Sequence, residues 1–248
     1  MQKRIYVITA LFIASLLLSA CGIGFGRRVI RGSGDVVSET REVSGFDRVR
    51  IEGAGELYLT QGETEALSIE AEDNIITEIT SKVENNVLII GFEDKLFEDR
   101  VIPTEPIKFY LTVIALEELN ISGAARVVSK SLNSEKFELD ISGAADINID
   151  SLTADSLDVN FSGGAECDLS GEVSDLTLIV NGAGSFDASD LESTNSDITI
   201  NGAAEVSLWV TEELDISING AGSVRYYGNP QVSQNIEGIG SVRSLGEK

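Results

Sequence analysis

Residues 218–223 read INGAGS, and close variants of this phrase recur throughout the second half of the chain. They are INGAAE from Ile200, VNGAGS from Val180, FSGGAE from Phe161, ISGAAD from Ile141 and ISGAAR from Ile121. From Gly123 to Gly238, the first glycines of successive phrases follow one another at intervals of 18–20 residues. A repeat of this length indicates a solenoid, in which each unit buries its apolar face against its neighbours.

Apolar residues occupy fixed places around each repeat glycine. Around Gly202, for example, they stand four and two residues before it, at Ile198 and Ile200, and four residues after it, at Val206. This alternation predicts a unit of strand, corner, strand and turn-rich connection, as in LTADSLDV and LESTNSDI. The sequence therefore predicts an all-β fold, a single-stranded parallel β-helix with coils of 18–20 residues. Because crossover connections between parallel strands are right-handed, we expect the β-helix to be right-handed.

The glycines mark the corners of the coils. Glycine is expected there because it permits a positive φ and leaves room inside a sharp bend. Ser or Asn precedes most of these glycines, and such side chains can hydrogen-bond along the stack. The structural repeat glycines are Gly53, Gly123, Gly143, Gly163, Gly182, Gly202, Gly220 and Gly238.

The predicted organisation has four parts. Residues 1–20 are a lipoprotein signal peptide, and residues 21–36 are a lipidated Cys followed by a flexible tether. Residues 37–115 form irregular first coils, with a separate small β subdomain as the alternative. Residues 116–248 form the regular repeats and a C-terminal cap, in which Tyr226 and Tyr227 are expected to cover the end of the core.

The N-terminus indicates export. Lys3 and Arg4 precede a short apolar run, which ends at Leu18-Ser19-Ala20-Cys21 and resembles a bacterial lipobox. By this resemblance, Cys21 is the lipid attachment site and acyl chains anchor the protein to a membrane. Gly22, directly after the Cys, favours a location at the outer membrane or the cell surface. An ordinary secretory signal with a chance Cys remains the alternative.

Composition excludes several functions. The chain has 248 residues, 41 acidic against 18 basic, no His and a net charge of -23. So acidic a chain argues against nucleic-acid binding, which needs a basic surface. Without His, Ser-His-Asp and Cys-His catalysis are excluded. Cys167 lies in an apolar column and is expected to be a buried hydrophobe, so zinc is not expected either.

Carboxylates also stack in columns that should face outward. Carboxylates in neighbouring coils would lie roughly 5 Å apart, an arrangement that favours Ca²⁺. Ca²⁺ is the single cofactor considered, and a solvated acidic face is the alternative. The candidate cation-binding residues are Glu138, Asp140, Asp146, Asp158, Glu166, Asp197 and Asp215.

Several phrases together resemble one known family. They are FDRVRIEGAGELYLTQG, VENNVLIIGF, IKFYLTV, the repeated Ile-(Ser/Asn)-Gly-Ala phrase and the closing YYGNP…IEGIGSV, spread over about residues 36–245. The resemblance is to the family called putative auto-transporter adhesin, head GIN domain. It implies a β-helical, surface-exposed bacterial protein, often with a lipoprotein signal, and it brings no catalytic residues.

Three functions remain open at this point. The first is a non-enzymatic surface lipoprotein whose adhesin-like head binds a glycan or an envelope protein. The second is a carbohydrate-active enzyme, a polysaccharide lyase or hydrolase, since β-helices host many of these. The third is a structural envelope component that associates with itself end to end.

Overall fold

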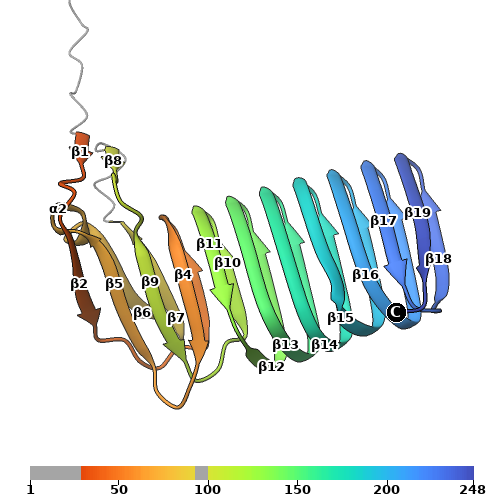
Figure 1. Cartoon of the computed structure of the whole chain (residues 1–248), viewed down its shortest axis with the longest axis horizontal. Helices are drawn as coiled ribbons and strands as arrows, with labels where there is room; N and C mark the ends of the chain where they lie inside the picture. Colours follow the sequence, from red (N-terminus) through yellow and green to blue (C-terminus); the bar gives the residue numbers. More distant parts are fainter. Residues whose placement is uncertain (1–28, 93–99) are drawn as a thin grey trace, which may run out of the picture.

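The protein is a long stack of β-coils. The structure, a computed structural model, describes residues 29–92 and 100–248. Seventeen of its strands belong to one continuous sheet system (Figure 1). The described residues contain one short helix, α2 (Asp73–Ile76), and no helix long and apolar enough to cross a membrane. The prediction of an all-β parallel solenoid is confirmed.

Each coil has a strand before the Gly bend and a strand after it. The first two coils consist of β3 (Arg48–Ile51) with β4 (Ala54–Gln61), and β10 (Glu118–Ile121) with β11 (Ala124–Ser129). Longer strands then run from bend to bend: β12 (Leu132–Ile141), β13 (Ala144–Phe161), β14 (Gly164–Val180), β15 (Ala183–Ile200) and β16 (Ala203–Ile218). The stack ends with β17 (Ala221–Tyr227), β18 (Gln231–Ile236) and β19 (Ile239–Gly246).

Parallel pairing brings equivalent residues of successive coils into line. Leu119 pairs with Leu139, which pairs with Val159, and all three are buried. The buried described residues form one hydrophobic cluster from Phe46 to Val224. Because residues 46–113 share this cluster with the regular coils, they are not a separate subdomain.

The repeat glycines do not have the positive φ expected of them. Positive φ is found at other glycines, including Gly171 and Gly228, but at none of the eight bends. From Gly123 to Gly238, a Cβ added to a repeat glycine would instead lie 1.8–2.0 Å from the carbonyl oxygen of the previous repeat glycine. A Cβ added to Gly53 would lie 2.7 Å from the ring of Phe92. Close contact between coils therefore explains the column of glycines.

The connections between coils are also more regular than expected. Residues 152–159 and 191–198 were expected to form turn-rich connections, but they lie inside β13 and β15. Both segments pair with the next coil, with register shifts such as the one between Ile149 and Leu152. Inward residues such as Leu152 and Leu191 are buried, and this burial holds the segments in the ladder despite their turn-forming residues.

The N-terminal end is built differently from the coils. Two strands continue the stack beyond β3 and β4 in parallel: β7 (Val87–Phe92) and β9 (Lys108–Val113). Three further strands add in antiparallel fashion: β6 (Ile79–Glu84) on β7, β5 (Ala66–Glu72) on β9, and β2 (Val36–Arg41) on β5. Residues 37–115, expected to be irregular first coils, thus combine parallel strands (β3, β4, β7 and β9) with antiparallel strands that belong to no coil.

Helix α2 covers this end of the core, because its own residues Ile75 and Ile76 are buried there. Two short strands, β1 (Val29–Arg31) and β8 (Arg100–Ile102), pair beside it as a separate small sheet (Figure 1). Residues 93–99, between β7 and β8, lie outside the described residues.

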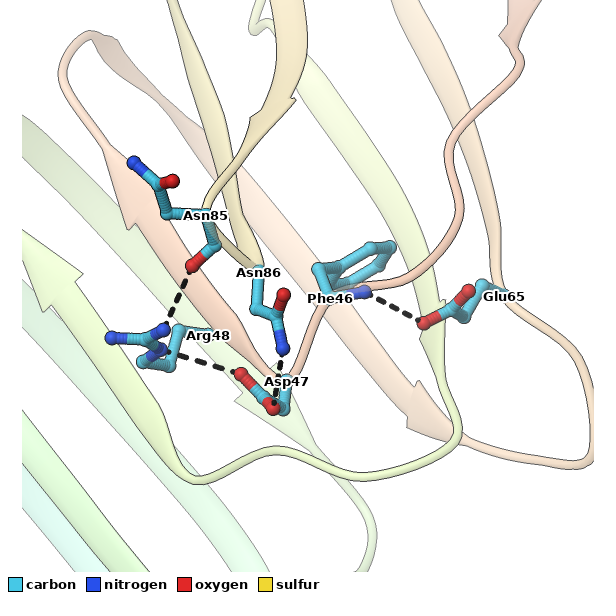
Figure 2. A network of polar contacts seen from close by, with 6 residues as sticks. All are labelled: Phe46, Asp47, Arg48, Glu65, Asn85 and Asn86. Atoms are coloured by element: carbon cyan, nitrogen blue, oxygen red, sulfur yellow. Dashed lines mark hydrogen bonds and ion pairs between the residues drawn. The ribbon is translucent and has the colours of Figure 1, made fainter.

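A polar network ties the start of the first coil to the β6–β7 hairpin (Figure 2). Asn85 and Asn86 have φ values of 52° and 65°, as a tight hairpin turn requires. The Arg48 guanidinium donates to the carbonyl oxygen of Asn85 at 2.8 Å, and the Asn86 amide donates to Asp47 at 3.4 Å. The backbone N–H of Phe46 donates to Glu65 at 3.2 Å. The FDR and ENN motifs therefore serve to position the first coil.

The C-terminal end is open. Tyr226 was expected to cover the core end, but it pairs with Leu208 on one side and Ser244 on the other, inside the stack. Tyr227 likewise pairs with Trp209 and Gly246. The prediction of a C-terminal cap is therefore wrong: β18 and β19 form one more coil, at the blue end of Figure 1.

Candidate functional site

A shallow concave groove follows the bends of successive coils. It has a volume of about 740 Å³ and is open to solvent along its length. Its floor is formed by the small residues directly after each bend, in β11, β13, β14 and β15. They are Ala124, Ala125, Ala144, Ala145, Gly164, Ala165, Ala183 and Gly184. We call this surface the alanine groove.

One edge of the alanine groove carries a charged row, one residue per coil. The parallel register lines up Arg126, Asp146, Glu166, Ser185 and Glu205. Arg126 lies 3.6 Å from Asp146, and Arg225 of β17 lies 2.6 Å from Glu205. The row therefore has an ion pair near each end, with the exposed Glu166 and the uncharged Ser185 between them, and it gives the groove a polar rim.

The structure brings the predicted acidic residues together in pairs. Glu138 pairs with Asp158, Asp146 with Glu166, and Asp197 with Asp215, while Asp140 stands between Asn120 and Asn160. All seven face away from the core, as expected. Within residues 29–92 and 100–248, no three acidic or Cys side chains are grouped as a metal site would require. Within the described strands the acidic residues thus stand in short ladders, Glu118–Glu138–Asp158 the longest, and cation binding by them stays a prediction.

Lys136 links one of these pairs. Its ammonium lies 3.1 Å from Asp158 and 4.0 Å from Glu138. The contact with Asp158 raises the pKa of Lys136. Partial burial and the neighbouring carboxylates, Asp140 first among them, raise the pKa of Glu138. The stacked carboxylates therefore do repel one another, and a lysine partly relieves the repulsion.

A second acidic ladder was missed by the sequence analysis. Asp168 pairs with Asp187 in the next coil, and both are exposed. Partial burial, and then the charges of Asp187 and Asp146, raise the pKa of Asp168. The signal was available, since both residues stand five positions after a repeat glycine.

Glu72, at the end of β5, was also missed. Its carboxylate is only 1% exposed and accepts hydrogen bonds from the backbone N–H groups of Gly34 at 2.8 Å and Thr104 at 2.9 Å. The Thr104 hydroxyl donates to it as well, and this bond is the main reason why the pKa of Glu72 is lowered. Glu72 therefore joins the segments that follow β1 and β8. No sequence pattern distinguishes it from Glu70, which is only partly buried.

A pair of stacked tyrosines lies on the side of the N-terminal region. The rings of Tyr58 and Tyr110 are 5.1 Å apart and nearly parallel, at 16°. Hydrogen bonding to Glu56 raises the pKa of Tyr58, while burial and then the hydrogen bond to Glu70 raise that of Tyr110. The repeated tripeptide Tyr-Leu-Thr in β4 and β9, whose residues pair in register, could have predicted this stack.

Of the two cysteines, the structure describes only Cys167. Cys167 is fully buried, as expected, and this burial raises the pKa of its thiol well above the ordinary value. It is therefore a core residue rather than a nucleophile. Cys21, the predicted lipid attachment site, lies outside the described residues.

The last residue, Lys248, turns back along the side of the stack. Its ammonium contacts the carboxylate of Asp190 and lies 5.1 Å from the ring centre of Trp209 and 5.5 Å from that of Tyr227. These contacts combine an ion pair with cation–π attraction. They draw the final residues away from the outer edge of β19.

The fold and its surface define a class: a parallel β-solenoid with a shallow, solvent-open groove and stacked polar columns. The chain belongs to the family described as putative auto-transporter adhesin, head GIN domain, whose model matches residues 45–230. The resemblance seen in the sequence is thus confirmed. No curated protein is significantly similar in sequence to the chain.

Solved structures are similar over almost the whole described fold. A putative adhesin from Bacteroides fragilis NCTC 9343 is 24% identical, with a TM-score of 0.82 over 87% of this chain and 100% of its own. A putative lipid binding protein from Parabacteroides distasonis ATCC 8503 is 21% identical, with a TM-score of 0.67 over 88% and 100%. A putative adhesin from Parabacteroides merdae ATCC 43184 is 19% identical, with a TM-score of 0.66 over 88% and 99%. These likenesses concern the fold.

Proposed function

We propose that this protein is the anchored head of a bacterial surface adhesin and that it binds its target without catalysis. The family match over residues 45–230 carries the proposal. The surface agrees with it, because a shallow groove with a polar rim suits an extended ligand such as a glycan chain or a protein segment. One structural relative is described as a putative lipid binding protein, and that description applies to that relative alone.

In this proposal, residues 1–20 direct export and Cys21 carries the acyl chains. The head, residues 29–248, then stands on the outer membrane or the cell surface and faces outward. Two or more acyl chains at Cys21 would anchor it stably, whereas a single chain binds only marginally. Metabolic incorporation of a labelled fatty acid, abolished by Cys21→Ser, tests this anchor.

A carbohydrate-active enzyme is the weaker alternative. Glycoside hydrolysis needs two carboxylates on opposite sides of a bound sugar, and their separation sets the stereochemistry. Asp146 and Glu166 instead stack along one edge of the alanine groove in neighbouring coils. This one-sided arrangement favours binding over cleavage.

The test uses purified residues 29–248 and immobilised glycans, peptidoglycan and envelope proteins. We expect saturable binding to at least one of these targets, without release of reducing ends. Ala144→Tyr fills the alanine groove from an exposed position and should weaken the binding at least tenfold. Thr153→Tyr, an exposed position away from the groove, is the matched control and should bind like the wild type. Reducing ends released from a polysaccharide would instead support the enzyme.

A further inference from the structure

The two ends of the stack are not equivalent. At the N-terminal end, antiparallel strands and helix α2 close the core, with Ile75 and Ile76 buried. At the C-terminal end, no described strand pairs with the outer edges of β18 and β19. A solenoid with one closed and one open end can extend only from the open end, through these two strands.

The open end displays apolar side chains. Ile239, whose ladder partner Ala221 also faces outward, is 83% exposed on the side of the last coil, while Ile236 and Val232 are 39% exposed each. Their partners one coil earlier, Ile218 for Ile236 and Leu214 for Val232, are buried. Both apolar ladders therefore reach the end of the stack without a covering layer.

The backbone at this end also has unused hydrogen-bonding groups. The N–H of Glu237 donates to Ile218 of the preceding coil at 2.9 Å. Successive backbone N–H groups of a strand point to opposite sides. The N–H groups of Ile236 and Gln234 therefore point away from the preceding coil, out of the open end. An exposed edge of this kind is a template for pairing with another strand.

The charge distribution favours one partner in particular. Residues 143–162, 163–181, 182–201 and 202–219 each contain four acidic residues and no Lys or Arg. Residues 220–248 contain three basic residues, Arg225, Arg243 and Lys248, against Glu237 and Glu247, a net charge of +1. The open end therefore lacks the net negative charge that makes the sides of two copies repel one another.

We propose that the last coil pairs with the last coil of a second copy of this chain, antiparallel and related by a two-fold axis. This symmetry is isologous, so the same apolar and edge groups meet on both sides and the association closes at a dimer. The contact is small, two strands about 10 Å apart, so it should bury less than the roughly 1,200 Å² of standard stable interfaces. We expect a dissociation constant between about 1 μM and 1 mM.

Such pairing would place the N-terminal ends of the two copies at opposite ends of the dimer, because each lies far from its own β19 (Figure 1). This consequence rests on the proposed function: two anchored copies could then bridge two facing surfaces. Many weak pairs between two cells would add up through multivalency.

Sedimentation equilibrium of residues 29–248 tests the pairing in solution, without any membrane or adhesion target. Two variants remove it in different ways. Gln234→Pro deletes an outward N–H and is tolerated where that group faces solvent, and Ile239→Glu places a charge on the most exposed apolar residue. Ile179→Glu is the matched control, because Ile179 is also exposed, at 37%, but lies on the side of the stack. Circular dichroism and the thermal midpoint verify that each variant is folded.

We expect the average mass of the wild type and of Ile179→Glu to rise to twice the monomer mass with concentration, while the other two variants remain monomeric. A wild type that stays monomeric up to about 1 mM overturns the proposal. Assembly beyond a dimer, or a dimer that survives both Gln234→Pro and Ile239→Glu, overturns it as well. Since this experiment contains no target, its failure leaves the proposed adhesin function to its own test.

Discussion

A methyl group added to Gly163 would lie 1.9 Å from the carbonyl oxygen of Gly143 in the preceding coil. The same relationship recurs from coil to coil, and the backbones at the bends touch directly. The bend residues also hydrogen-bond across the coils, as in Gly164 N–H to Gly143 at 3.0 Å. The repeat glycines therefore leave no room for a side chain, and substitutions there should disturb the stack strongly.

Two neighbouring glycines make a matched pair for testing this contact. Gly163→Ala should lower the free energy of unfolding by about 2–4 kcal/mol, because the backbone must move to admit the methyl group. At Gly164, the nearest atom to an added Cβ is 3.8 Å away, so Gly164→Ala should be neutral or stabilise by up to about 1 kcal/mol. Urea denaturation of both variants measures the difference, and equal losses would contradict the account.

The asparagines before the bends form a hydrogen-bonded ladder. Asn201 donates to Asn181 at 2.8 Å and accepts from Asn219 at 2.8 Å. Asn201→Ala removes both bonds and should destabilise the protein by about 1–2 kcal/mol. Ser162→Ala, in the same column, removes only a 3.4 Å contact with the carbonyl of Ile141, so a smaller loss is expected in the same denaturation experiment. The ladder has no stabilising role if Asn201→Ala has no effect.

Glu72 should make the stability depend on acidity. Its folded pKa lies below the ordinary value of 4.5, so its contribution is present above 4.5 and is lost as the pH falls through the folded pKa. Glu72→Gln should therefore be less stable than the wild type at pH 7, and its stability should fall less steeply on acidification below 4.5. Thermal midpoints measured across this range check the difference, with Glu70→Gln, at a partly exposed position of the same strand, as the control. Parallel curves for Glu72→Gln and the wild type would show that Glu72 has no such role.

Cys167 should be inert in the folded protein. The side chain is fully buried, and burial raises its pKa, so almost no thiolate exists near neutral pH. A thiol reagent added to residues 29–248 should therefore react only after denaturation, with one equivalent. Rapid reaction under native conditions would mean that the coils around Cys167 open readily.

The repeated phrase predicted the coils, the inward apolar columns and the Ser/Asn column, because spacing alone determines which residues meet in a parallel ladder. It did not predict the order of β2 to β9, since Leu67, Ile69 and Leu88 alternate in the same way in a parallel or an antiparallel strand. The reason for the repeat glycines could not be predicted either, because the sequence shows a Gly in the same way whether a positive φ or a close approach between coils requires it. Glu72 was missed because its burial depends on the distant residues Gly34 and Thr104.

The adhesin function itself is tested most directly on living cells. A bacterial strain carrying the full chain should adhere to its target surface, and the number of attached cells should drop to that of a strain lacking the protein when Cys21→Ser removes the anchor. Immunoblots verify that both forms are exported in equal amounts. Equal attachment of cells with and without the wild-type protein, on every glycan, peptidoglycan and envelope-protein surface, would contradict the account.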